Sequence, residues 1–298
     1  MNKTDRVTLS VVVATHNEAA IIKRCLAAVK KFADELVVVD GESTDETVAI
    51  AKRFGARVIQ TSNKPIFHLN KQLGLEQARG EWVLQLDADE VVSEELGKEI
   101  AGVIEMSEGE IRARVLPAEK RKLFKRHQQL LAERDGYKYI DQGLTKGFFV
   151  PRRNFFLNRF LRYGGTYPDG VIRLVRKQAA YFPSKSVHEQ MVVTGRVDWL
   201  VNDLLHYDSP TLDKYWERAN RYTTLTAKEW KRRGLRLSFT NTFYYLLVKP
   251  VATFGILYIR HKGFLDGLAG FLFALFSGLH FTLAYFKYWE MRRMVRKV

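Results

Sequence analysis

Three carboxylates follow directly on an apolar segment of the chain. In LQLDADE (84–90) the alternating leucines are typical of a β-strand, and Asp87, Asp89 and Glu90 come at its end. Two aspartates one residue apart at a strand end can face one divalent cation, and Mg²⁺ or Mn²⁺ accepts such oxygen ligands and bridges to phosphates. We therefore predict a metal site at Asp87 and Asp89, and interpret Glu90 as a charge at the start of a helix. An isolated Asp-x-Asp pair is more often a solvated loop, so the prediction depends on the surrounding elements.

The surrounding sequence alternates between strand and helix patterns, which predicts a parallel sheet with right-handed crossovers. Ligands of such sheets lie beyond the carboxyl ends of the strands. Polar clusters occur at three of these ends, THNE (15–18), DGESTD (40–45) and DADE (87–90), so we expect them to converge on one edge. The expected strands are 8–15, 35–40, 56–61 and 81–87, and the expected helices are 18–32, 43–55 and 66–79.

The composition limits the classes of protein that fit. The 298 residues carry a net charge of +15 and are 46% hydrophobic, enough for one large or two small domains with a buried core. The surplus positive charge indicates an anionic partner: nucleic acid, anionic lipid or a phosphorylated substrate. The single cysteine, Cys25, excludes an internal disulfide and a cysteine-based zinc site, and it fits a reducing compartment. The start, MNKTDRVTLSVVV, does not match a signal peptide.

Two common phosphate-binding loops are missing from the sequence. It contains no G-x-x-x-x-G-K-[ST] loop, and no G-x-G-x-x-G turn follows the first expected strand. This argues against a P-loop ATPase and against a dinucleotide-dependent dehydrogenase. A diphosphate bridged by a metal ion is the favoured substrate chemistry.

Two long apolar segments lie near the end of the sequence, at 238–259 and 264–286. Each approaches the ~20 residues needed to span a bilayer, but charged residues and a proline interrupt them. We therefore expect helices that lie in, or dip into, the cytoplasmic leaflet, with Tyr and Trp at the level of the headgroups. A spanning hairpin and a pair of buried core helices are the alternatives. The residues expected to contact anionic lipid are Lys287, Arg292, Arg293, Arg296 and Lys297.

Three segments, VVVATHNEAAIIKRCL, ELVVVDGESTDET and ARGEWVLQLDADE, resemble the family 2 glycosyltransferases of the GT-A fold. The resemblance implies an α/β fold with a Rossmann-like, mostly parallel sheet flanked by helices, followed by an apolar helical module that associates with membranes. The later segments YPDGVIRLVRK, VHE and LHYDSPTLDKYWERANRY resemble the branch with the lipopolysaccharide core β-glucosyltransferases of the WaaE type. The implied parts are a nucleotide-sugar-binding half at 1–115, an acceptor-binding and catalytic half at 116–235, and a membrane-associated tail at 236–298.

The resemblance also implies an activity, the inverting and metal-dependent transfer of a sugar from a nucleotide-sugar donor. For this branch the sugar would be glucose from UDP-glucose, and the acceptor a lipid-linked anionic glycan such as lipopolysaccharide core. The implied cofactor is Mg²⁺ or Mn²⁺. The implied location is the membrane surface at the cytoplasmic face of the bacterial inner membrane, with no nucleic acid as a partner.

Residues that match the family's motifs receive implied roles at the donor site. Asp40 matches the aspartate that holds the uridine, and Asp89 matches the more direct metal ligand, with Asp87 as its partner and as a donor contact. The chain has His16 where the family commonly has Tyr, which leaves stacking on the base open. Further implied contacts are Thr15 and Glu18 with the base and His206 with the metal or diphosphate, and we expect Arg173 and Arg176 to meet phosphate.

An inverting transferase needs a base that takes the proton of the acceptor hydroxyl, normally a carboxylate within hydrogen-bond reach. Glu189, in SVHEQ, lies where related enzymes place this base and is our first candidate. Asp169, in YPDG, is the second, although this sequence is also typical of a turn. His68 and His127 lie in polar segments and are expected to face solvent.

Two other functions are weighed against this hypothesis. A polyprenyl-phosphate glycosyltransferase would share the donor-binding half but transfer the sugar to a lipid phosphate, and product analysis would separate the two. A basic nucleic-acid-binding protein would use the arginines and aromatic residues of 148–176 to contact phosphates and stack bases. However, no nucleic-acid-binding motif is present, and acidic strand ends would repel a phosphate backbone.

Overall fold

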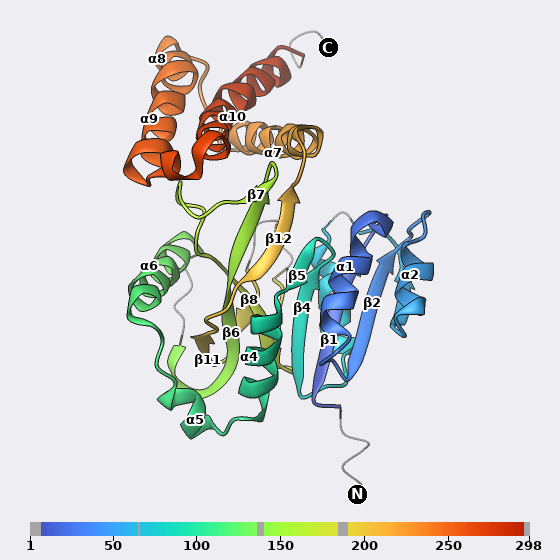
Figure 1. Cartoon of the computed structure of the whole chain (residues 1–298). Coiled ribbons are helices and arrows are strands. Elements are labelled where there is room, and N and C mark those ends of the chain that lie inside the picture. The colour runs from blue at the N-terminus through green and yellow to red at the C-terminus, as the bar shows by residue number, and fades with distance from the viewer. Residues whose placement is uncertain (1–6, 65, 136–139, 184–189, 295–298) are drawn as a thin grey trace, which may run out of the picture. The chain divides into compact units, whose positions relative to one another are not determined.

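The computed structural model describes residues 7–64, 66–135, 140–183 and 190–294. The chain forms two compact units that alternate along the sequence (Figure 1). The first unit comprises Met1–Arg152 and Pro168–His206, and the second comprises Arg153–Tyr167 and Tyr207–Val298. The division into functional parts at residues 115 and 235 stays a prediction, because compact units need not coincide with functions.

The first unit is built on four parallel strands that the sequence predicts closely. Their spatial order is β3-β2-β1-β4, and helices lie against the sheet (Figure 1). Strands β1, β2 and β4 are apolar along most of their length because both faces of a parallel sheet are covered. Their bounds are Leu9–Thr15 for β1, Glu35–Gly41 for β2, Arg57–Thr61 for β3 and Trp82–Asp87 for β4.

Three helices connect these strands, as predicted. Helix α1 buries Ile22, Cys25, Leu26 and Val29, so the single cysteine belongs to the core. The bounds are Ala19–Val29 for α1, Thr47–Arg53 for α2 and His68–Gln77 for α3. Each crossover helix returns the chain to the amino end of the sheet, so the carboxyl ends of β1, β2 and β4 share one edge.

Antiparallel strands extend the sheet beyond β4. Strand β8 pairs antiparallel with β4 and with β6, and β12 pairs antiparallel with β5. The path through the sheet is β3-β2-β1-β4-β8-β6-β12-β5, which confirms the predicted α/β class with a mixed sheet flanked by helices. The bounds are Glu90–Val92 (β5), Glu94–Glu105 (α4), Glu108–Ala113 (α5), Ala118–Asp135 (α6), Ile140–Phe156 (β6), Asp169–Arg176 (β8), Ala180–Tyr181 (β9), Val192–Val193 (β10), Arg196–Trp199 (β11) and Leu204–Ser209 (β12).

The second unit is mainly helical. Its long helix α7 packs against the last helix, α10, which also contacts the helical segments before it. Gly278 lies so close to Pro250 that an added Cβ would come within 2.6 Å of the Pro250 carbonyl oxygen, which requires glycine where these helices cross. The bounds are Arg159–Phe160 (β7), Leu212–Arg232 (α7), Phe239–Phe243 (α8), Tyr244–Val248 (η1), Lys249–Gly255 (α9), Ile256–Arg260 (η2), Gly263–Asp266 (η3) and Gly267–Met294 (α10).

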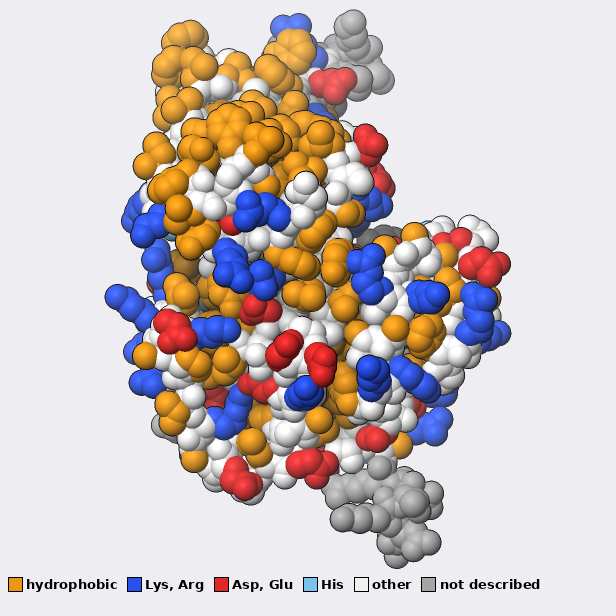
Figure 2. Space-filling view, in the orientation of Figure 1, with side chains coloured by type: hydrophobic (Ala, Val, Ile, Leu, Met, Phe, Trp, Pro, Cys, Tyr) orange, Lys and Arg blue, Asp and Glu red, His pale blue; other side chains and the backbone are white. Residues whose placement is uncertain are grey.

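Two helical stretches of this unit, 239–260 and 263–293, are long and apolar enough to cross a membrane. Only 6% and 28% of their most apolar windows are buried, which argues against the alternative of a pair of core helices. Hydrophobic side chains gather over α8, α9 and α10 on the face shown in Figure 2. Membrane association therefore fits these exposed apolar surfaces.

Two charged residues of the apolar segments form hydrogen bonds within the second unit. Asp266 is buried and accepts hydrogen bonds from the backbone N–H groups of Arg162 and Tyr163. Lys287 donates to oxygens of Asn220 and Thr223 in α7, at 2.6 and 2.8 Å. The lipid contact of Lys287 stays a prediction, and Arg296 and Lys297 lie outside the described residues.

Candidate active site

Polar residues from three neighbouring strands meet at one edge of the parallel sheet. In the register of β1, Thr15 lies opposite Asp40 of β2, and Ala14 lies opposite Asp87 of β4. The strand ends that carry the three predicted polar clusters are therefore adjacent. The topology explains why these strand ends are adjacent, since neighbouring parallel strands end on the same side of the sheet.

The aspartate at the end of β2 is fully buried and only partly satisfied. Asp40 Oδ2 accepts a hydrogen bond from the Ser43 N–H at 3.0 Å. Its Oδ1 atom and the hydroxyl of the adjacent Thr15 have no hydrogen-bond partner among the residues that the structure describes. Buried polar atoms are normally paired, and leaving one unpaired costs about 1–3 kcal/mol. The two atoms are thus suited to a polar ligand at this edge.

The loop after β1 is hydrogen-bonded to the segment after β2. His16 Nδ1 donates to the Gly41 carbonyl oxygen at 2.6 Å, and the Glu18 N–H donates to Thr47 Oγ1 at 2.8 Å. Asn17 adopts the left-handed conformation, with φ of 56°, and its N–H donates to Ser43 Oγ at 2.8 Å. His16 and Glu18 therefore belong to a fixed rim beside Asp40, and their contact with a base stays a prediction.

Asp87 contacts a cation with each of its carboxylate oxygens. Lys71 of α3 forms an ion pair with Oδ1, and Arg173 of β8 binds Oδ2 at 2.8 Å. Burial alone would raise the pKa of Asp87, but Lys71 and Arg173 outweigh it and hold this pKa well below its usual value of 3.8. Asp87 is therefore ionised, and a metal ion at Asp87 would share its carboxylate with two cationic side chains.

Glu90 is the centre of this charge cluster. It is fully buried, and its Oε1 accepts hydrogen bonds from Arg173 at 2.7 Å and from Arg152 at 3.0 Å. Its Oε2 accepts the backbone N–H of Asp87 at 3.0 Å. The interpretation of Glu90 as a helix-start charge is wrong, because α4 begins four residues later, at Glu94, with Ser93 as its cap.

The second base candidate is joined to the same cluster. Asp169 begins β8 and lies opposite Arg152 of β6, whose guanidinium donates to Asp169 Oδ2 from Nε at 3.0 Å and from Nη2 at 2.7 Å. Burial would lower the pKa of Arg152, but Asp169 and Glu90 raise it above its usual value. Asp169 is therefore an anchored carboxylate. The first candidate, Glu189, lies outside the described residues.

Asp89 and His206 face each other at the edge of the sheet. Asp89 Oδ2 lies 3.3 Å from His206 Nε2, and His206 pairs in register with Glu90 through β12 and β5. A carboxylate oxygen and an imidazole nitrogen at this distance can bind one cation together. No group of three or more His, Cys, Asp or Glu side chains arranged for a metal occurs in the described parts of the chain.

Three residues have surroundings that differ from those expected from the sequence. Arg176 lies opposite Trp82 at the amino end of β4, pairs with Glu81, and so is not among the side chains at the strand-end edge. His68 is buried and stacks on Phe182 with ring centroids 4.9 Å apart, so the expected solvent exposure is wrong. His127 is half-buried, and its Nε2 accepts the Gly170 N–H at 3.0 Å, so it is not fully solvent-facing either.

Sequence reasoning missed Lys71 and Arg152 as members of the cluster. Lys71 is buried in α3, and its ammonium also lies 4.7 Å from the centre of the Phe67 ring. Burial lowers its pKa, and Asp87 opposes this effect. One signal was available in the sequence, since three adjacent carboxylates require nearby cations when they are buried. This requirement does not identify which lysines or arginines are the partners.

Comparison with known proteins assigns the family. Residues 10–181 match the family described as Glycosyl transferase family 2, which covers more than half of the chain, and the chain belongs to this family. An uncharacterized glycosyltransferase of Rickettsia bellii is 44% identical over 242 residues, which span 77% of this chain and 70% of that protein. The lipopolysaccharide core biosynthesis glycosyltransferase LpsC of Rhizobium meliloti is 27% identical over 296 residues, 96% of this chain and 93% of LpsC.

A solved structure supports the predicted fold. The mannosyltransferase of Pyrobaculum calidifontis, determined in complex with GDP-Man and Mn²⁺, superimposes with a TM-score of 0.50 over 96% of this chain and 88% of that protein. The two sequences are 13% identical, so the likeness concerns the fold. Together with the family assignment and the observed sheet, it confirms the predicted GT-A fold.

The charge cluster yields a prediction about stability. Replacing Glu90 by Gln removes the carboxylate that faces Arg152 and Arg173, and breaking a buried charge cluster on one side costs about 3 kcal/mol or more. We expect Glu90→Gln to lower the free energy of unfolding in urea by about that amount. Glu94→Gln, which removes an exposed carboxylate paired with Lys98, is the matched control and should change it little. Equal stability of the two variants would contradict this role for Glu90.

Proposed function

We propose that the protein is an inverting, metal-dependent glycosyltransferase that moves a hexose, glucose from UDP-glucose, onto a lipid-linked glycan. The observation that carries this proposal is the gathering of Asp40, Asp87 and Asp89 at the carboxyl edge of the parallel sheet in a family 2 glycosyltransferase. Ligands of parallel sheets bind at this edge. The motif residues and the ligand-binding edge of the fold therefore coincide.

The donor is proposed to bind with its base against β2 and its diphosphate toward β4. Asp40 Oδ1 and Thr15 Oγ1 supply polar atoms without partners among the described residues, and these suit hydrogen bonds to the base. Thr15, His16 and Glu18 form the rim beside it. At the other end, Lys71 and Arg173 supply positive charge beside Asp87, where a diphosphate would bring negative charge.

A divalent cation fits the pair formed by Asp89 and His206. Their facing atoms, 3.3 Å apart, are an oxygen and a nitrogen donor, and substrate oxygens and water can complete the coordination. When bound, Mg²⁺ or Mn²⁺ would neutralise charge on the leaving diphosphate. Asp87 stays in this proposal as a neighbouring ligand or donor contact, since Lys71 and Arg173 already occupy both of its oxygens.

The chemical step also needs a base that accepts the proton of the attacking acceptor hydroxyl. We keep Glu189 as the first candidate and Asp169 as the second. The Arg152 guanidinium, which contacts both Asp169 and Glu90, orients the Asp169 carboxylate. A general base must be held in a position from which it can reach the proton that it accepts.

The acceptor is proposed to be a lipid-linked anionic glycan, such as lipopolysaccharide core, presented at the cytoplasmic face of the bacterial inner membrane. Support comes from the likeness to LpsC over nearly the whole chain and from the exposed apolar helices at 239–260 and 263–293. A helix pair on a membrane surface would keep the enzyme beside an acceptor that cannot leave the membrane.

A donor screen tests the proposed function. Nucleotide release is measured with UDP-, GDP-, dTDP- and ADP-sugars, each with and without Mn²⁺, for the wild type and for Asp89→Ala. We expect release from UDP-glucose that depends on Mn²⁺ and falls at least about 100-fold in Asp89→Ala. Asp213→Ala removes an exposed carboxylate in the first turn of α7 and serves as the control. Release by Asp89→Ala at the wild-type rate in the presence of a chelator would contradict the metal role.

A second comparison separates the two base candidates. Glu189→Gln preserves the size of the side chain but removes the proton acceptor, so we expect donor binding to persist while kcat falls by roughly two to four orders of magnitude. Asp169→Asn is measured in parallel. A near-normal kcat in Glu189→Gln together with a collapse in Asp169→Asn would assign the role to Asp169.

A further inference from the structure

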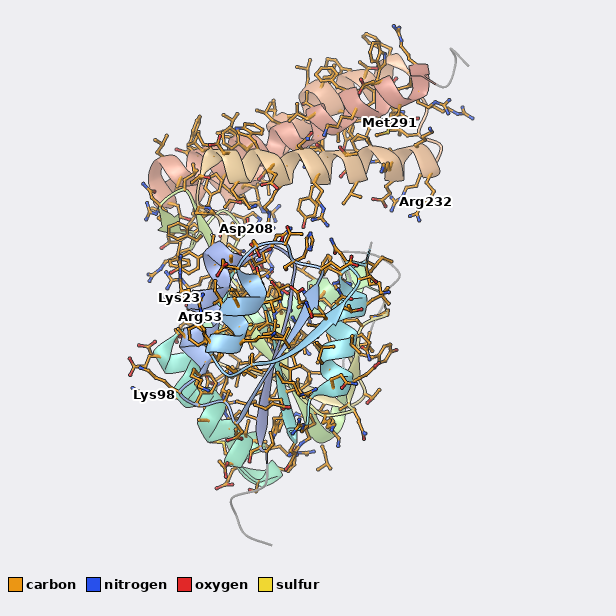
Figure 3. The ribbon with its side chains drawn as sticks, turned by 90° about the vertical axis from the view of Figure 1, so that its right-hand side faces the viewer. Lys23, Arg53, Lys98, Asp208, Arg232 and Met291 are labelled. Carbon is orange, nitrogen blue, oxygen red and sulfur yellow. The ribbon has the colours of Figure 1, made fainter. Side chains whose placement is uncertain are left out.

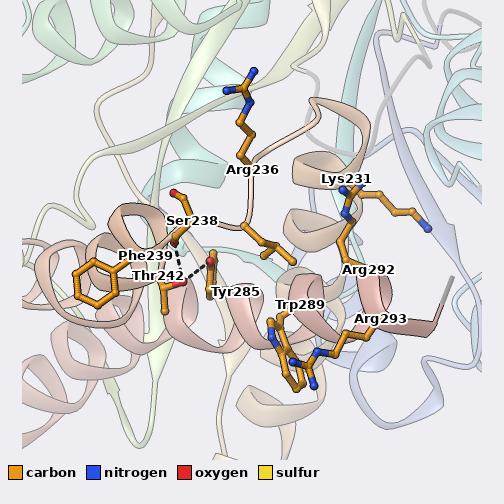
Figure 4. A pocket seen from close by; sticks show the side chains of 10 residues that line it. Lys231, Arg236, Ser238, Phe239, Thr242, Tyr285, Trp289, Arg292 and Arg293 are labelled. Atoms are coloured by element: carbon orange, nitrogen blue, oxygen red, sulfur yellow. Dashed lines mark hydrogen bonds between the residues drawn. The ribbon is translucent and has the colours of Figure 1, made fainter. Parts of the chain in front are cut away.

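A hollow of about 830 Å³ lies within the second unit, outside the residues assigned to sugar transfer (Figure 4). It is formed by the end of α7, the connection to α8, the start of α8 and the end of α10. The residues that line it are Lys231, Arg236, Leu237, Ser238, Phe239, Thr242, Tyr285, Trp289, Arg292 and Arg293.

Four cationic side chains surround this hollow, and its lining contains no carboxylate. Lys231, Arg236, Arg292 and Arg293 form no ion pair with any residue in the described part of the chain. Other cations of the unit do have acidic partners, as in the contact between Arg233 and Glu229. Four like charges around one space repel one another, and an anion inside it would relieve that repulsion.

The inner wall of the hollow is polar, and its edge is apolar and aromatic. Thr242 Oγ1 donates to the Ser238 carbonyl oxygen at 2.9 Å and lies 2.8 Å from the Tyr285 hydroxyl, as the dashed lines in Figure 4 show. Phe239 is 86% exposed and Trp289 is 42% exposed, and the Arg293 guanidinium lies 4.1 Å from the centre of the Trp289 ring. Exposed aromatic rings beside arginines are typical of the membrane–water interface.

We propose that this pocket binds the phosphate-bearing headgroup of an anionic membrane lipid. The four cations that line the pocket attract the phosphate, and Phe239 and Trp289 enter the boundary between headgroups and acyl chains. The pocket opens where the exposed apolar stretch 239–260 begins, so lipid tails beside that stretch would continue from a headgroup in the pocket. This continuity favours a lipid over a free anion, and it assigns a ligand that sugar transfer does not use.

The test measures binding of the full-length protein to vesicles of phosphatidylcholine alone or mixed with phosphatidylglycerol. Arg236→Gln/Arg292→Gln removes two pocket cations, and Lys228→Gln/Arg232→Gln removes two exposed cations of α7 that do not line the pocket (Arg232 is labelled in Figure 3). One cation near an anionic surface contributes about fivefold to binding. We expect the pocket variant to bind mixed vesicles about 25-fold more weakly than the wild type, and the control variant to lose less than about threefold.

Several outcomes would overturn the proposal. Equal losses in the two variants would mean that charge acts diffusely over the surface and that no lipid occupies the pocket. Equal binding of the wild type to the two kinds of vesicle would exclude an anionic lipid. Binding of inorganic phosphate that the pocket variant loses, without any preference of the wild type for the mixed vesicles, would mean that the pocket takes a free anion. Nucleotide release from a soluble donor should be unchanged in both variants, so failure here is distinguishable from failure of the proposed function.

Discussion

The rest of the first unit depends on one buried carboxylate, that of Glu90, and on the cations that it requires. A fully buried charge is tolerated only when it is paired and hydrogen-bonded. Arg173 from β8 and Arg152 from β6 meet this requirement, and the N–H of Asp87 completes it. The antiparallel strands are therefore joined electrostatically to the end of the parallel sheet, and Asp87 receives a fixed backbone position.

In this arrangement the neighbouring carboxylates have different partners. Asp87 is held ionised between Lys71 and Arg173, whereas Asp89 faces His206. A chain with net charge +15 can thus keep three carboxylates together at a strand end, because the cluster supplies the cations locally. The same cations lie where the diphosphate of a nucleotide sugar would need positive charge, so the elements that stabilise the site also suit its ligand.

Much of the fold could be predicted from the sequence, because short apolar strands alternating with amphipathic helices allow few arrangements. The motif at Asp87 and Asp89 was also recognisable, because it directly follows a strand pattern in the sequence. The partners of these residues were not, since Lys71 and Arg152 reach the cluster from distant segments through tertiary packing. His68 shows the limit in the opposite direction, because a polar local sequence concealed a ring that stacks on Phe182.

The central claim is that the carboxyl edge of β1, β2 and β4 binds a nucleoside diphosphate together with a metal ion. The most direct test is calorimetric titration of the full-length protein with UDP, with and without Mn²⁺. The account predicts that Mn²⁺ tightens UDP binding and that Asp40→Asn weakens it, because Asp40 contributes the buried acceptor at this edge. Undetectable UDP binding in the presence of Mn²⁺, or unchanged affinity in a folded Asp40→Asn variant, would contradict the account.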